Sequence, residues 1–212
     1  MGTKDQDLFA ELRIKGEVYN LPIVEGTIGD NAIDIRSLRK DSGHITYDNG
    51  LANTGSCRSN ITFVDGDNGV LLYRGYAIED IAENCSFVEV AYLLVHGKLP
   101  NAEELLSFRR HLNEHSMIHE DMQHFFNGMP PNSHPMAILS SMVTSLSSFY
   151  PHIMDDDPNF DVTAARLISK VRTIAAFSYK KSRGEPVVYP RHDLTYCANF
   201  LNMMFANPVK AY

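Results

Sequence analysis

The feature that most constrains the fold is a change in the spacing of apolar residues near Ala77. Before it, apolar and polar residues alternate in short runs, which is typical of half-buried β-strands. After it, apolar residues recur every three or four positions, as on one face of an α-helix, between helix start and stop signals. The sequence therefore predicts a mainly α fold, a helical bundle with a small β-containing N-terminal segment.

Two β-hairpins are expected in the first third of the chain. The first turns at Lys15-Gly16-Glu17, and the second joins residues 61–64 to 70–73 through Asp65–Gly69, where several residues tolerate positive φ. We therefore divide the chain into a β-rich segment, residues 1–50, and a helical portion, residues 51–212, which carries the hairpin near 61–73.

The helical portion begins with two N-cap signals. Ser86 and Glu89 have the spacing of a capping box, and the helix that follows, 87–95, is apolar nearly all round, so we expect it to be buried centrally. Asn101 is the next expected cap, and it opens an amphipathic helix that continues to about Phe126.

Three further helices are expected, from Pro135, over 162–179, and from Asp193 as an N-cap, with a loop at 155–158. Serines of the first of these need hydrogen-bond partners such as the preceding turn's carbonyls. The apolar stripe of the last helix is expected at Leu194, Cys197, Leu201 and Met204.

Composition excludes several classes of protein. The net charge of −7 argues against binding to nucleic acid or to an anionic membrane. Three widely spaced cysteines form neither a disulfide framework nor a metal motif, and a reducing compartment fits them. The sequence has no secretory signal core and no apolar run long enough to span a bilayer. These features predict an acidic, soluble, cytoplasmic protein.

Candidate chemical motifs in the sequence are weak. His111, His115 and His119 have the spacing of one helix face, but the outer two would lie about 12 Å apart, too far to share one zinc ion. Ser56 and Cys57 match neither a hydrolase nucleophile elbow nor a cysteine protease signature, which favours a packing or turn role. We therefore predict no metal site, no cofactor and no catalytic residue from these motifs.

One basic cluster is more informative. Arg166 and Lys170 are four residues apart and would share a helix face, and the sequence offers an aromatic partner in Tyr150. Two cations with an aromatic ring suit a phosphate-bearing ligand. From the residues alone, a solvated basic face ranks ahead of a binding site.

Collinear sequence words along nearly the whole chain resemble citrate synthase of the bacterial, allosterically regulated type (type I, the NADH-regulated class). They are IDIR at 33–36, SC at 56–57, TFVDGD at 62–67, RG at 74–75, EV at 89–90, SMIHE at 116–120, SHPMA at 133–137, FY at 149–150, YPR at 189–191 and NFLNMMF at 199–205. Because the words occur in order, the resemblance covers the N-terminal, large-domain portion of that family.

The resemblance implies a mainly α fold and assembly as a homodimer or a hexamer. It also implies a reaction of the tricarboxylic acid cycle, in which acetyl-CoA, oxaloacetate and water give citrate and CoA. The family's catalytic Asp, His and Arg residues correspond to positions after Tyr212. No residue of this chain is therefore assigned a catalytic or cofactor-binding role, and the chain alone is expected to be inactive.

The resemblance also implies an allosteric nucleotide site. The regulated bacterial enzymes bind NADH as an inhibitor, and the matching positions here are His115, Ser116, Tyr150, Arg166 and Lys170. Two departures weaken the match: Glu114 stands where the family has an arginine, and Val209 stands where it has a reactive cysteine. A carboxylate facing a phosphate repels it, so we expect weakened or absent NADH inhibition.

Two alternatives remain open. One is a fragment of 2-methylcitrate synthase, an enzyme of the same superfamily whose pocket residues differ. The other is a non-catalytic helical protein of the same ancestry, with an interaction or regulatory role.

Overall fold

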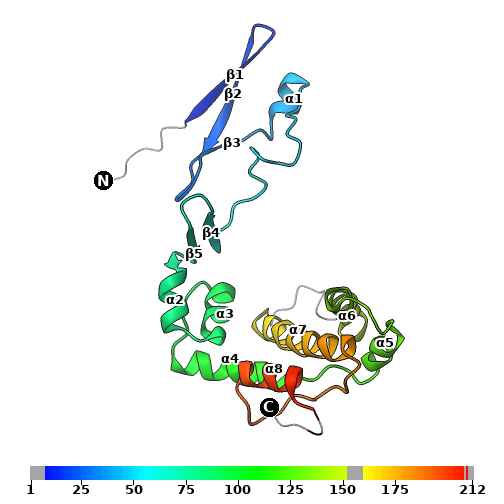
Figure 1. The fold of residues 1–212 in the computed structure, drawn as a ribbon. Helices are drawn as coiled ribbons and strands as arrows, with labels where there is room; N and C mark the ends of the chain where they lie inside the picture. Colours follow the sequence, from blue (N-terminus) through cyan, green and yellow to red (C-terminus); the bar gives the residue numbers. More distant parts are fainter. Residues whose placement is uncertain (1–7, 152–159, 208, 210–212) are drawn as a thin grey trace. The chain divides into compact units, whose positions relative to one another are not determined.

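The computed structural model describes residues 8–151, 160–207 and 209, so the loop expected at 155–158 lies outside the described residues. The chain divides into two compact units, Met1–Ile78 and Glu79–Tyr212. The described residues contain eight helices and two small sheets (Figure 1), which confirms the mainly α prediction. The boundary expected between residues 50 and 51 stays a prediction.

The first sheet of the N-terminal unit is antiparallel. Its strands are β1 (Phe9–Ile14), β2 (Glu17–Val24) and β3 (Ala32–Ile33). The expected hairpin is confirmed: Leu12 pairs with Tyr19, and the turn residues Lys15 and Gly16 both have positive φ. Helix α1 (Leu38–Ser42) packs against β2, where Leu38 and Leu21 are buried.

The second sheet contains the other expected hairpin. Its strands are β4 (Thr62–Asp65), β5 (Val70–Tyr73) and β6 (Tyr76–Ala77). The Asp65 carboxylate accepts hydrogen bonds from the backbone and side chain of Asn68, at 3.0 and 2.8 Å, which fixes the turn. Gly29 packs closely on this sheet, since a Cβ there would lie 3.2 Å from the Phe63 ring at a φ of +99°.

The second unit is helical. Its elements are α2 (Ile78–Asn84), which begins at the boundary, α3 (Phe87–His96), α4 (Ala102–Glu114), α5 (Met122–Gly128), α6 (Pro135–Phe149), α7 (Phe160–Ser182) and α8 (Tyr196–Phe205). The expected caps at Ser86 and Asn101 are both confirmed, and each forms a capping box, Asn101 with Glu104. Central burial of α3 is not observed: Val88, Tyr92 and Leu93 are buried, whereas Phe87 is 52% exposed.

The helix expected to run from Asn101 to Phe126 is interrupted. Helix α4 ends at Glu114, and α5 starts only at Met122. The physical reason is a set of side chains on α7 that donate hydrogen bonds to carbonyls of this region, including those of Ser116 and Met117. Consequently His119 lies outside α4, and the three histidines do not share one helix face.

Helix α7 is the centre of the helical unit. It packs against α4, α6 and α8, and Figure 1 shows α6 and α7 side by side. The main core cluster consists of buried residues from α5, α6, α7 and α8 and from the α4–α5 connection: Ile118, Met122, Phe126, Ile138, Met142, Leu146, Ile174, Ala176, Phe177 and Met203. On α6, the hydroxyls of Ser141, Thr144 and Ser145 donate to carbonyls one turn earlier, as the sequence predicted.

The last helix starts two residues later than expected. Thr195 occupies the N-cap position of α8, while the Asp193 carboxylate pairs with Arg191 at 2.6 Å. The predicted apolar stripe is wrong in phase, because Asn199 and Met203 are the buried residues. Asn199 tolerates burial because its amide accepts from the Arg191 N–H at 3.0 Å and donates to the Arg191 carbonyl at 2.6 Å.

Candidate functional site

The connection after α4 carries two of the predicted site residues, His115 and Ser116. Side chains of α7 hold this connection by hydrogen bonds. Four polar residues of α7 donate to oxygen atoms of this connection and of the last turn of α4: Ser169 to the Leu112 carbonyl, Lys170 to the Met117 carbonyl, Arg172 to the Ser116 hydroxyl and Thr173 to the Ser116 carbonyl. These side chains satisfy carbonyls that the end of α4 leaves without helical partners. The connection and the polar face of α7 therefore form one hydrogen-bonded unit, which we call the α4 exit turn.

Lys170 lies at the centre of this site. Its side chain is 4% exposed, its Nζ donates to the Met117 carbonyl at 2.6 Å, and it lies 4.2 Å from the centroid of the Tyr150 ring. Burial lowers the pKa of Lys170 to about 8, and the charge of Arg166 adds to this effect. The structure thus brings Lys170 and Tyr150 together as a cation–π pair.

His115 and Arg166 lie beside Lys170, and the Arg166 guanidinium adds a second positive charge there. Burial lowers the pKa of His115, the charges of Arg166 and Lys170 lower it further, and the carboxylate of Glu114 opposes them. Both His115 and Arg166 are half-buried, so their side chains are within reach of solvent. Burial raises the pKa of Tyr150, which occupies the C-cap position of α6.

Ser116 has a different environment from the one expected for a ligand contact. It is 5% exposed, and its hydroxyl accepts from Arg172 at 2.9 Å while lying 2.7 Å from the Asn113 carbonyl. Its hydroxyl therefore supports the turn in this structure. The five predicted residues gather around one turn, but only His115, Arg166 and Tyr150 are half-exposed.

Arg172 is the neighbour that sequence reasoning missed. It is 4% exposed, and burial lowers its pKa. The available signal was its position within the run Leu167 to Phe177, in which most residues are apolar or small, as on a largely covered helix. Together, Arg166, Lys170 and Arg172 concentrate positive charge within the α4 exit turn. This positive charge suits the binding of an anion.

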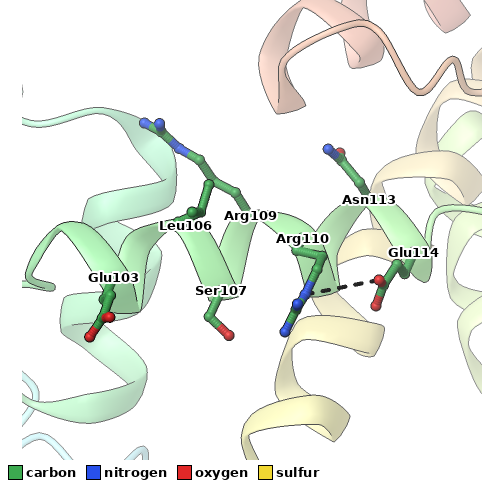
Figure 2. A pocket seen from close by; sticks show the side chains of 7 residues that line it. All are labelled: Glu103, Leu106, Ser107, Arg109, Arg110, Asn113 and Glu114. Atoms are coloured by element: carbon green, nitrogen blue, oxygen red, sulfur yellow. Dashed lines mark ion pairs between the residues drawn. The ribbon is translucent and has the colours of Figure 1, made fainter.

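No cluster able to hold a metal ion is found in the described ranges. A shallow depression elsewhere is lined by Glu103, Leu106, Ser107, Arg109, Arg110, Asn113 and Glu114. Figure 2 shows that all seven side chains come from α4, with Arg110 and Glu114 forming an ion pair at 4.0 Å. This open surface carries side chains of both charge signs, and the Arg110–Glu114 pair on it is exposed to solvent.

Among the residues that the structure describes, no helix is both long and apolar enough to cross a membrane. Cys57, Cys85 and Cys197 are free thiols.

Comparison with known proteins gives consistent results. Residues 50–212 match the family model described as citrate synthase, C-terminal domain. Citrate synthase from Thermotoga maritima MSB8 is 32% identical with a TM-score of 0.63, over 77% of this chain and 42% of that chain.

Two further structures are also similar. One is the Thermoplasma acidophilum citrate synthase in ternary complex with carboxymethyl coenzyme A and oxaloacetate, at 26% identity and a TM-score of 0.69, over 75% of this chain and 42% of that chain. The other is the Pyrobaculum aerophilum citrate synthase, at 28% identity and a TM-score of 0.65, over 88% of this chain and 46% of that chain. The chain therefore matches less than half of the length of each of these structures.

Proposed function

The chain belongs to the citrate synthase family, whose model it matches over residues 50–212, and from this premise we propose that it functions within an enzyme that condenses acetyl-CoA and oxaloacetate to citrate and CoA. That match is the observation that carries the proposal. The similar Thermoplasma enzyme, solved with a CoA analogue and oxaloacetate, supports the same substrates.

The role proposed for these residues is that of a scaffold in the N-terminal portion of the enzyme. A catalytic site needs a base, an electrophilic partner and carboxylate-binding groups that converge on one pocket. The α4 exit turn offers cations and a ring but no such arrangement. We therefore propose that the chain alone has no synthase activity. Separately, we propose a reducing, cytoplasmic setting, with which the free cysteines are consistent.

The experiment has two steps. The coding sequence is read beyond the Tyr212 codon, and any longer product is assayed for CoA release with acetyl-CoA and with propionyl-CoA. A continuing frame and a preference for acetyl-CoA support citrate synthase, whereas a preference for propionyl-CoA supports 2-methylcitrate synthase. A stop codon after Tyr212 supports the non-catalytic alternative, and CoA release by residues 1–212 alone contradicts the scaffold role.

We also propose that the α4 exit turn is the regulatory nucleotide site of this enzyme, with His115, Arg166 and Tyr150 outermost and Lys170 and Ser116 beneath them. The support is the gathering of cations around a ring at 4.2 Å from Lys170. Glu114 adds an opposing carboxylate, and Val209 supplies no thiol. We therefore expect the complete enzyme, as a homodimer or a hexamer, to be only weakly inhibited by NADH. Strong inhibition at micromolar NADH would contradict this expectation.

A further inference from the structure

Arg172 is a buried cation that the proposed regulatory site does not yet use. Its side chain is 4% exposed. Among residues 8–151, 160–207 and 209, no carboxylate forms an ion pair with it. A buried charge without a counter-charge is unfavourable, since hydrogen bonds to neutral groups replace only part of its hydration. The guanidinium is therefore poised to accept an anion as a partner.

The contacts of Arg172 join two separate elements. Its Nη2 donates to the Ser116 hydroxyl on the α4 exit turn at 2.9 Å, and its Nη1 donates to the Tyr196 carbonyl at the start of α8 at 3.2 Å. Its Cζ also lies 4.3 Å from the centroid of the Tyr196 ring. The side chain thus bridges the candidate site and the first turn of α8.

The third nitrogen of the guanidinium, Nε, is buried and has no hydrogen-bond partner in the described structure. An unmet buried donor on a charged group is costly. A phosphate oxygen beside Ser116 would supply both a hydrogen-bond acceptor and a counter-charge, which a neutral carbonyl cannot. Because the guanidinium is planar and multidentate, it suits phosphate oxygens better than an ammonium group does.

We propose that Arg172 is a further binding and relay residue of this site: when a phosphate-bearing anion occupies the α4 exit turn, the Nε of Arg172 donates to the anion, the guanidinium shifts away from Tyr196, and the start of α8 loosens. The inference rests on the proposed regulatory site. The effect reaches α3 as well, since the Tyr196 ring stacks on Phe87 with centroids 5.0 Å apart. The Tyr196 hydroxyl also donates to the Ile168 carbonyl at 3.0 Å, a contact between α8 and α7 that does not involve Arg172.

The experiment measures hydrogen exchange of backbone amides in residues 194–200 of the chain, with and without saturating inorganic pyrophosphate, and repeats the titration with NADH. Pyrophosphate is expected to speed exchange in this segment of the unmodified chain. In Arg172→Met the exchange is expected to be fast already and unresponsive, and pyrophosphate affinity to fall by about tenfold or more. Arg172→Lys should be intermediate, and Arg109→Met, which changes an exposed arginine of α4, should behave as the unmodified chain.

Each outcome decides the question. Pyrophosphate binding that leaves residues 194–200 unchanged overturns the relay, and failure of pyrophosphate to bind overturns the inference as a whole. If pyrophosphate binds but NADH does not, Arg172 keeps its role, and only the proposal that the site binds a nucleotide is contradicted. If Arg172→Met does not fold, as judged by circular dichroism, the response of the unmodified chain and of Arg172→Lys still decides.

Discussion

Replacement of Lys170 by methionine tests how α7 tolerates a buried ammonium group. The pKa of Lys170 is lowered from 10.5 to about 8, chiefly by burial. One pKa unit corresponds to about 1.4 kcal/mol, so the native state disfavours the charged form by about 3 kcal/mol relative to the unfolded chain. Between pH 8 and 10.5 the unfolded chain binds a proton that the native chain has lost, and the free energy of unfolding therefore rises with pH.

The expected result is a difference in slope between the two proteins. The unmodified chain gains up to about 3 kcal/mol over this range, whereas Lys170→Met lacks that gain. Near pH 7 two effects oppose each other: the variant escapes the cost of a buried charge but leaves the Met117 carbonyl without its 2.6 Å hydrogen bond. The two proteins are therefore expected to lie within about 2 kcal/mol of each other at neutral pH.

Urea denaturation followed by circular dichroism, at pH values from 7 to 10.5, measures this difference. Subtracting the curve of the variant removes the contributions of cysteines and tyrosines that titrate in the same range. Lys181→Met, which changes a half-buried lysine on the same helix, is the matched control. Parallel curves for the unmodified chain and Lys170→Met would refute the reasoning.

Three further substitutions test the packing. Lys180 is fully buried and donates to the Ala206 carbonyl at 2.6 Å, so Lys180→Met should destabilise the chain by about 2–4 kcal/mol in urea melts, and no change would contradict its role in docking α8. Ser86→Ala removes the N-cap of α3 and should cost about 1 kcal/mol, measured the same way. Asn199→Leu leaves the backbone of Arg191 without two hydrogen bonds and should cost about 1–3 kcal/mol, whereas a stabilised variant would show that the apolar core prevails.

Local signals predicted those parts of the fold that local chemistry determines. Both capping boxes were predictable because a side chain and a backbone amide three residues apart satisfy each other without help from the rest of the chain. The hairpin turn at Asp65 was predictable for the same reason. The end of α4 at Glu114 was not predictable, because the side chains that donate to the carbonyls after it lie on α7, more than fifty positions later.

The same distinction holds at the candidate site. The spacing of Arg166 and Lys170 placed them on one helix face, but only the fold reveals that Lys170 is buried under Tyr150. Asn199 and Arg172 were missed because a polar residue is expected to face solvent unless a partner is known. Their partners, the backbone of Arg191 and the oxygens of Ser116 and Tyr196, come from distant segments and cannot be inferred from spacing alone.

The hydroxyl groups of α6 affect how another segment can pack against that helix. Because Ser141, Thr144 and Ser145 already donate to carbonyls of their own helix, desolvating this face leaves none of these three donors without a partner. Small side chains also lose little conformational entropy when they are covered. Although its side chains are polar, the free-energy cost of dehydrating this face is small. Another segment can therefore pack closely against it, as it would against a row of alanines.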